Sequence, residues 1–329
     1  RDLHRVDRRQ HQMCIRDSYG RVPYPIHLQG TGLTYEGTSI SIERLSGALG
    51  RSVFERLSVG LNWGEPSLID IRNHDAVHLD LGEVYPWLIS YPRIQRALES
   101  MESLQGSALI GEASLIGPLR DPGRWTYNVE AHVENASFQH RFFPATVHIK
   151  KGRLHWVPGR LTFFNCESAF LDAMLGVSGT LDIPKGGLTS VDLQLSGGMA
   201  SSAMDWIFER ADVPEGFRVR GPLRLADGRF SWNKDQRVSF SGNLTQTDGR
   251  RVGLDLRSQP GGLNIPRLVV QDRESRSTFT IVRKEGSVDI TFEGVLFGST
   301  LDQLLLRNEI LDGAVEGSFQ IAIHSDRFM

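Results

Sequence analysis

Apolar and polar residues alternate along most of the chain in short runs that are separated by residues typical of turns. Each run places apolar side chains on one face of a strand and polar side chains on the other, as in an antiparallel sheet with one solvated face. The clearest runs are Val77/Leu79/Leu81, Val147/Ile149, Val191/Leu193/Leu195, Val252/Leu254/Leu256, Val288/Ile290/Phe292 and Phe319/Ile321/Ile323. Turns such as Thr247-Asp248-Gly249 and Pro260-Gly261-Gly262 separate them. The pattern predicts a mainly β fold, an elongated and twisted antiparallel sheet.

Three short segments have helical spacing instead. Residues 92–104 carry Ile94, Leu98 and Met101, residues 201–210 begin with serines that can cap a helix, and residues 299–308 carry a stripe of leucines. We expect a short helix in each segment. Their regular separation along the chain indicates that the helices lie at the junctions of repeats.

A literal repeat supports this organisation. Gly117-Pro118-Leu119-Arg120 precedes Trp125, and Gly221-Pro222-Leu223-Arg224 precedes Trp232. We therefore predict three β repeats, over residues 19–105, 106–210 and 211–329. The last includes its own helix and the start of a further repeat.

The first residues have a different character. Met13-Cys14-Ile15-Arg16-Asp17-Ser18 resembles the translated end of a sequencing adapter. We interpret residues 1–18 as a cloning or assembly scar that is disordered, with a natural basic tail as the alternative. On the first interpretation the natural N-terminus is missing.

Composition excludes several classes of function. Apolar residues make up 40% of the chain and charged residues 23%, with a formal net charge of −2, so the chain can form a core. It has no basic stripe with interleaved aromatic residues, so we expect no nucleic-acid partner. No apolar run is long enough to span a bilayer as a helix. Apart from Cys14, Cys166 is the lone cysteine, which supports neither a disulfide framework nor a metal site.

The sequence contains little that resembles a catalytic centre. His74 and His78 could chelate zinc on a helix, but on a strand their imidazoles are about 13 Å apart and share a solvated face. Gly30-Thr31-Gly32 is followed by a strand pattern rather than by the helix that a phosphate loop needs. Hydrolase signatures are absent. We therefore predict no catalytic residues, no metal and no cofactor, and a protein that is not an enzyme; the rival interpretation is a β-sandwich enzyme acting on carbohydrate.

The apolar faces are the candidate functional surface. Three helices of about ten residues cover only part of them, so the sheet either packs its faces on each other or curves into an open groove whose floor binds a ligand. Acyl chains, long and apolar, fit such a floor. The candidate groove residues are Val191, Leu193, Leu195, Val252, Leu254, Leu256, Val288, Ile290 and Phe292.

Several spacings resemble those of the AsmA-like superfamily, including its YhdP and TamB branches. They are Leu301-x-x-Leu304-Leu305 followed by Gly313-x-x-x-Gly317, the Gly106–Trp125 segment, and the progression from Pro144 through Lys151-Gly152 and Phe163-Phe164 to Ser178-Gly179-Thr180-Leu181. The resemblance covers most of residues 20–329 and implies a repeating β-groove protein of the bacterial envelope. It also implies periplasmic localisation, an inner-membrane anchor that this sequence lacks, and phospholipid transport towards the outer membrane.

We therefore expect an internal fragment of a non-enzymatic envelope protein whose groove binds and conducts phospholipid acyl chains and contributes to outer-membrane biogenesis. The alternative is a structural or adhesive β array with no lipid cargo. The sequence does not identify protein partners.

Overall fold

Antiparallel strands account for most of the residues that the structure describes, which confirms the prediction of a mainly β fold with a few short helices. The computed structural model describes residues 13–17, 24, 26–90, 95, 98–121, 124–184 and 187–324. Two units can be distinguished. Unit 1 contains Arg1–Thr162 and Pro184–Gly187, and unit 2 contains Phe163–Ile183 and Leu188–Met329. The three predicted repeats are shorter than these units, and their boundaries remain a prediction.

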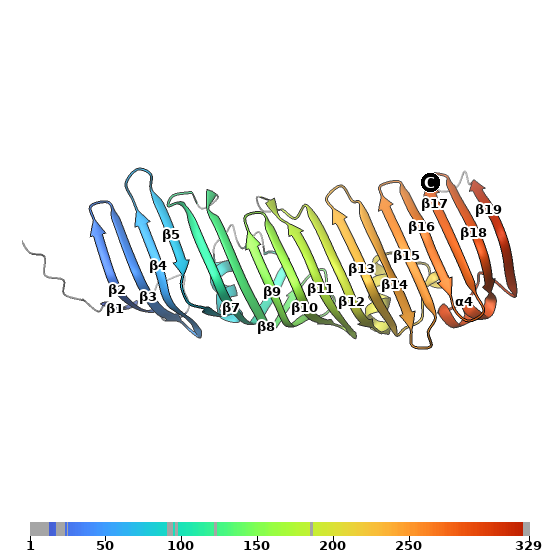
Figure 1. Cartoon of the computed structure of the whole chain (residues 1–329), viewed down its shortest axis with the longest axis horizontal. Coiled ribbons are helices and arrows are strands. Elements are labelled where there is room, and N and C mark those ends of the chain that lie inside the picture. The colour runs from blue at the N-terminus through green and yellow to red at the C-terminus, as the bar shows by residue number, and fades with distance from the viewer. Residues whose placement is uncertain are drawn as a thin grey trace, which may run out of the picture. The chain divides into compact units, whose positions relative to one another are not determined.

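Unit 1 is a sheet in which most strands pair with the next strand along the chain (Figure 1). Its elements are β1 (Met13–Asp17), β2 (Ile26–Glu36), β3 (Ser39–Leu49), β4 (Ser52–Asn62), β5 (Leu68–Asn73), β6 (Val77–Asp80), α1 (Leu81–Ile89), β7 (Met101–Pro118), β8 (Thr126–His140) and β9 (Val147–Val157). β5 and β6 both pair with the long strand β7, and β4 also contacts β6. The core of this unit includes Ala108, Val133 and Ala136, with Leu79 and Leu81 packed against them.

Helix α1 is not where the sequence pattern placed the first helix. The structure puts Met101–Leu104 in β7 instead of the predicted helix over 92–104, of which residues 92–94, 96 and 97 lie outside the described residues. α1 begins after Asp80, whose side chain accepts a hydrogen bond of 3.1 Å from the Glu83 amide. Asp80-x-x-Glu83 has the spacing of a capping box. The predicted strand run Val77/Leu79/Leu81 is therefore wrong at Leu81, which is the first residue of α1.

The prediction that residues 1–18 are disordered is wrong for one segment. Met13–Asp17 forms β1, which pairs with β2 from Met13↔Gly30 to Asp17↔Ile26. This pairing differs from the expectation of a disordered segment. The remainder of residues 1–18 lies outside the described residues.

Unit 2 consists of strands that follow one another in chain order (Figure 1). Its elements are most of β10 (Arg160–Phe170), then β11 (Ala173–Asp182), β12 (Ser190–Met199), α3 (Ser201–Arg210), the 3₁₀ turn Glu215–Phe217, β13 (Leu223–Asn233), β14 (Val238–Gln246), β15 (Arg251–Gln259), β16 (Gly262–Gln271), β17 (Arg276–Lys284), β18 (Ser287–Phe297), α4 (Gly298–Leu304) and β19 (Ala314–His324). α3 has the predicted bounds. α4 overlaps the predicted helix over 299–308 but ends at Leu304.

The literal repeat does not occupy equivalent places. Gly117-Pro118 ends β7, whereas Gly221-Pro222 comes before β13. A different repeat is present within unit 2. Asp172, in the turn before β11, accepts hydrogen bonds from the Ser202 and Ala203 amides at the start of α3, at 2.7 and 2.9 Å. Asp272, in the turn before β17, accepts a hydrogen bond of 2.8 Å from the Thr300 hydroxyl in α4.

Candidate functional site

All nine candidate groove residues lie on one face of the unit 2 sheet. Antiparallel partners point to the same side, so the pairing register can be followed from strand to strand. Leu193 pairs with Phe230, Phe230 with Phe240, and Phe240 with Leu256, which places Leu193 and Leu256 on one face. Leu254 is two residues from Leu256 and therefore shares that face.

The same argument extends to β18. Leu254 pairs with Leu268, Leu268 with Phe279, and Phe279 with Phe292. β-Bulges in β13 and β16 each add one residue without changing the side to which the flanking side chains point. We call this side of β12–β18 the apolar face. Leu193 and Leu254 lie on the same side, as predicted.

The opposite side of these strands is polar. Asp192, Gln194 and Ser196 alternate with the apolar residues of β12 and are exposed. In β15 the intervening Asp255 forms a loose ion pair with Arg257, at 3.7 Å. The polar side chains of the alternating pattern thus stay in water, as the pattern predicts.

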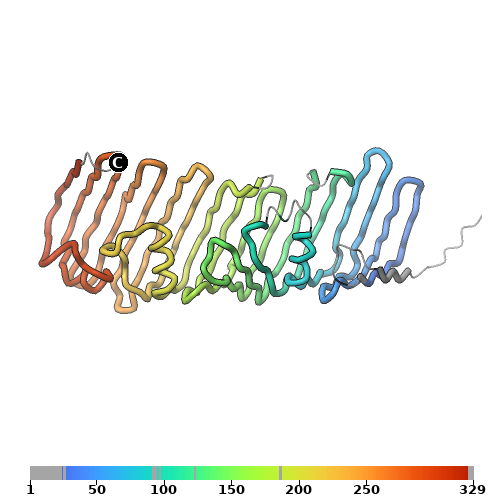
Figure 2. Tube along the Cα trace, turned by 180° about the vertical axis from the view of Figure 1, so that it is seen from behind, coloured from blue at the N-terminus to red at the C-terminus, as the bar shows by residue number. Residues whose placement is uncertain are grey.

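Burial divides the apolar face into two parts. Val252 and Phe292 are buried, with 6% and 1% of their surface exposed. The other seven candidates are only partly buried. Val252 and Phe292 belong to a cluster with Leu301, Leu304 and Leu305 of α4 and its C-terminal end. We call this part the covered end. Figure 2 shows the segments of α3 and α4 lying over one end of the unit 2 strands.

Hydrogen bonds hold α4 on the covered end. The Ser275 and Thr300 hydroxyls lie 2.6 Å apart, and the Ser275 hydroxyl accepts a bond of 3.0 Å from the Phe297 amide. Burial alone would raise the pKa of Asp272, but bonds from the Ser275 amide, the Thr300 hydroxyl and the Glu274 amide outweigh it and lower that pKa. Asp272 is therefore a charged acceptor that connects the β16–β17 turn to α4.

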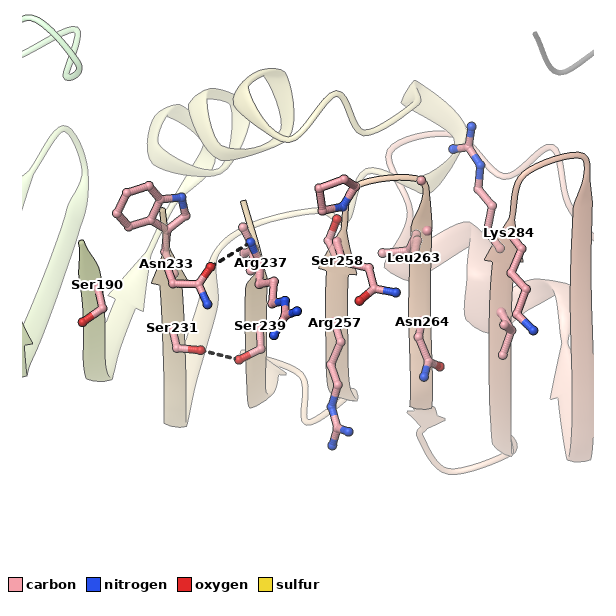
Figure 3. A pocket seen from close by; sticks show the side chains of 18 of the residues that line it. Ser190, Ser231, Asn233, Arg237, Ser239, Arg257, Ser258, Leu263, Asn264 and Lys284 are labelled. Carbon is pink, nitrogen blue, oxygen red and sulfur yellow. Dashed lines mark hydrogen bonds between the residues drawn. The ribbon is translucent and has the colours of Figure 1, made fainter. Parts of the chain in front are cut away.

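The opposite ends of the strands, where β13–β14, β15–β16 and β17–β18 are joined by turns, form the turn edge. A hollow of about 720 Å³ lies there. Trp232, Val238 and Leu263 of the apolar face line this hollow. Side chains of the polar side, such as Ser231 and Ser239, line the rest of it (Figure 3). The Ser231 and Ser239 hydroxyls are 2.6 Å apart, and the Arg237 amide donates to the Asn233 side chain at 3.2 Å.

One charged residue interrupts the apolar face. Arg283 pairs with Leu263 on one side and Val288 on the other, both of which point to the apolar side. Among the paired residues of β12–β18 on this face, it is the only one with a charge. The sequence reasoning missed it because the alternating run in β17 was not among those singled out, although Phe279/Ile281/Arg283 follows the same period.

The described residues contain no cluster of histidine, cysteine or acidic side chains suited to a metal ion. His74 and His78 are both exposed, but only His78 lies on a strand, β6; His74 is in the bend between β5 and β6, and its ring lies 2.6 Å from the Ser58 hydroxyl. No described helix is both long and apolar enough to cross a membrane. Comparisons with protein families, with curated proteins and with solved structures found no match to this chain.

Proposed function

We propose that unit 2 binds lipid acyl chains on the exposed part of its apolar face. The observation that carries the proposal is that seven of the nine candidate residues share one face and remain partly exposed. Contiguous exposed apolar surface of this kind marks an interaction site, because water contact with it is unfavourable. Valine, leucine, isoleucine and phenylalanine offer no hydrogen bonds, so the ligand that they favour is itself apolar and is bound without regard to sequence.

The wider setting follows from the resemblance to the AsmA-like superfamily. We place the chain in an envelope protein that is anchored in the inner membrane, reaches into the periplasm and conducts phospholipid through an open groove. On this proposal transport is passive and non-enzymatic, and it requires no cofactor. The competing proposal, a structural array without cargo, is favoured by the covered end, where apolar residues pack against helix α4 as in an ordinary core.

Leu254→Glu tests the proposal. Leu254 is partly buried and lies near the middle of the apolar face of β15. On an open face the new carboxylate stays hydrated, so the expected loss of stability is about 1 kcal/mol, while acyl chains are excluded. The measurements are thermal melting and the amount of co-purified phospholipid by mass spectrometry.

Val269→Glu is the matched control. Val269 is also partly buried, but it pairs with Gly253 and Thr278 on the polar side of the neighbouring strand. We expect this variant to keep the lipid content of the wild type. A wild-type protein that carries no lipid, together with unfolding of Leu254→Glu, would favour the structural array instead.

A further inference from the structure

The hollow at the turn edge is strongly cationic. Arg237, Arg257, Arg283 and Lys284 line it, with Asp192 as the one carboxylate, whereas the whole chain has a formal net charge of −2. The cations come from the three neighbouring hairpins β13–β14, β15–β16 and β17–β18, and Figure 3 shows Arg237, Arg257 and Lys284 around the hollow. A local excess of positive charge in a concave site attracts anions.

Three of these cations are not neutralised by the protein. Within the part of the chain that the structure describes, the side chains of Arg237, Arg283 and Lys284 form no ion pair and no hydrogen bond, and all three are exposed. Arg257 is different, because it approaches Asp255 on the polar side. The guanidinium groups of Arg237 and Arg283 retain all their donors, and these match the paired oxygens of a phosphate.

The hollow also adjoins the apolar face. Trp232 and Leu263 line it, and both belong to the last row of that face, as does Arg283. An aromatic side chain with a polar edge, next to cations, is the composition that proteins place at the boundary between lipid tails and headgroups. Binding of a free phosphate does not require the apolar residues Trp232 and Leu263 in the wall of the hollow.

We propose that the hollow binds the phosphate of an anionic lipid headgroup, whose acyl chains extend from Trp232 and Leu263 onto the apolar face. This inference rests on the proposed function, because the acyl-binding face supplies the rest of the lipid site. It differs from the proposed function in one respect: headgroups at this edge are held by Arg237, Arg283 and Lys284, the last of which reaches the hollow from the polar side of β17, instead of remaining in solvent.

The test uses the full chain and three soluble probes. Dihexanoyl phosphatidylglycerol carries both parts of the ligand, dihexanoylglycerol carries the acyl chains alone, and glycerol phosphate carries the phosphate alone. Isothermal titration calorimetry measures each dissociation constant for the wild type and for the triple variant Arg237→Gln/Arg283→Gln/Lys284→Gln. Each cation near a lipid phosphate strengthens binding by about fivefold, so we expect the triple variant to bind phosphatidylglycerol at least about tenfold more weakly. Binding of dihexanoylglycerol should be unchanged.

The matched control is Arg224→Gln/Arg251→Gln/Arg276→Gln. These exposed arginines form a row on the polar side near the other strand ends. Their substitution removes three positive charges, as many as in the hollow variant. The control should bind phosphatidylglycerol within about twofold of the wild type, because long-range charge effects are screened at physiological salt. An equal loss in both triple variants would overturn the site and leave only a general charge effect.

The two proposals fail in different ways. If the wild type binds both lipids and the hollow variant binds them equally well, the headgroup site is wrong and the acyl-binding face stands. If glycerol phosphate binds as tightly as phosphatidylglycerol, the hollow is a site for free phosphate and the lipid assignment is overturned. If the wild type binds neither lipid, the proposed function itself is wrong.

Discussion

The covered end and the turn edge belong to the same face of the same strands, yet their environments are opposite. At the covered end, Val252 and Phe292 are buried under helix α4 in a cluster of leucines. Two to four residues further along these strands, Leu254, Leu256, Val288 and Ile290 are partly exposed, and the face ends at a hollow lined by Arg283. The sequence pattern is the same in both parts. What differs is whether a helix covers it.

This difference shows what the helices do in unit 2. An alternating strand needs only one dry side, and either protein or an apolar ligand can supply it. At the covered end the chain supplies its own cover and gains ordinary core stability. At the turn edge it leaves apolar surface next to unpaired cations, an arrangement that stabilises the fold little and suits an amphipathic ligand.

The largest expected effect is that of Val252→Glu. Val252 is 6% exposed and packs in the cluster with α4, so a carboxylate there is buried without a partner and costs several kcal/mol. We expect loss of the cooperative unfolding transition, measured by circular dichroism during thermal melting. Leu254→Glu, two residues away, should keep this transition. An equal loss of the unfolding transition in both variants would show that the two parts of the face are equally buried.

Gly294→Ala tests the close approach of β17 and β18, the strand that leads into α4. Gly294 has a φ of +125°, and an added Cβ would clash with the Arg276 carbonyl oxygen. Strain of about 1–3 kcal/mol is typical of such a backbone, and the steric conflict adds to it. Gly317→Ala is the control, since Gly317 has a φ of +122° but open space around it. Chemical denaturation should show the larger loss for Gly294→Ala; the reverse order would contradict the role of this close approach.

Asp272 should make the free energy of unfolding of unit 2 depend on pH. Its lowered pKa means that folding favours the charged carboxylate, so its contribution is present above the ordinary aspartate value of 3.8 and is lost as the pH falls through the folded value. Asp272→Asn should cost about 1 kcal/mol at neutral pH and flatten the decline in stability at acidic pH. Urea denaturation between pH 3 and pH 7 compares the two proteins. Identical pH profiles would show that Asp272 does not contribute.

Arg283→Gln should have the smallest effect on stability. The side chain is exposed and forms no ion pair within the described ranges, so the free energy of unfolding should change by less than about 0.5 kcal/mol. Urea denaturation provides the measurement. A loss above 1 kcal/mol would mean that Arg283 is part of the fold and is not available for a ligand.

The sequence predicted the strands and the sidedness of this sheet well because alternation is a local signal. The runs around Val191, Val252 and Val288 form strands, and the bulged register still brings their apolar residues onto one side. The bounds of α3 also agree with its short amphipathic stripe, although its serines do not cap it: Ala200 is at the N-cap position, and Asp172 accepts hydrogen bonds from the Ser202 and Ala203 amides. The alternation and the amphipathic stripe depend on neighbouring residues only.

The remaining features depend on residues far apart in the chain. Nothing near Val252 indicates that Leu301 and Leu304 cover it, because the contact depends on the path of the chain after β18. Asp272 and Thr300 are likewise connected only by the fold. The misplaced first helix had a different cause: Asp80 and Glu83 have the spacing of an N-terminal cap, but Leu81 continues the alternation of Val77 and Leu79 and was assigned to a strand.

The chain-order pairing of β11 to β19 has a kinetic consequence. Each strand finds its partner across a short connection, so forming a hairpin requires little loop-closure entropy, and growth can continue one strand at a time. Folding of such a sheet can begin at any hairpin and spread, and unfolding can begin at an end and stop at a stable strand. Native-state hydrogen exchange should therefore show protection that rises from β19 inward, with the amides around Phe292 among the slowest to exchange.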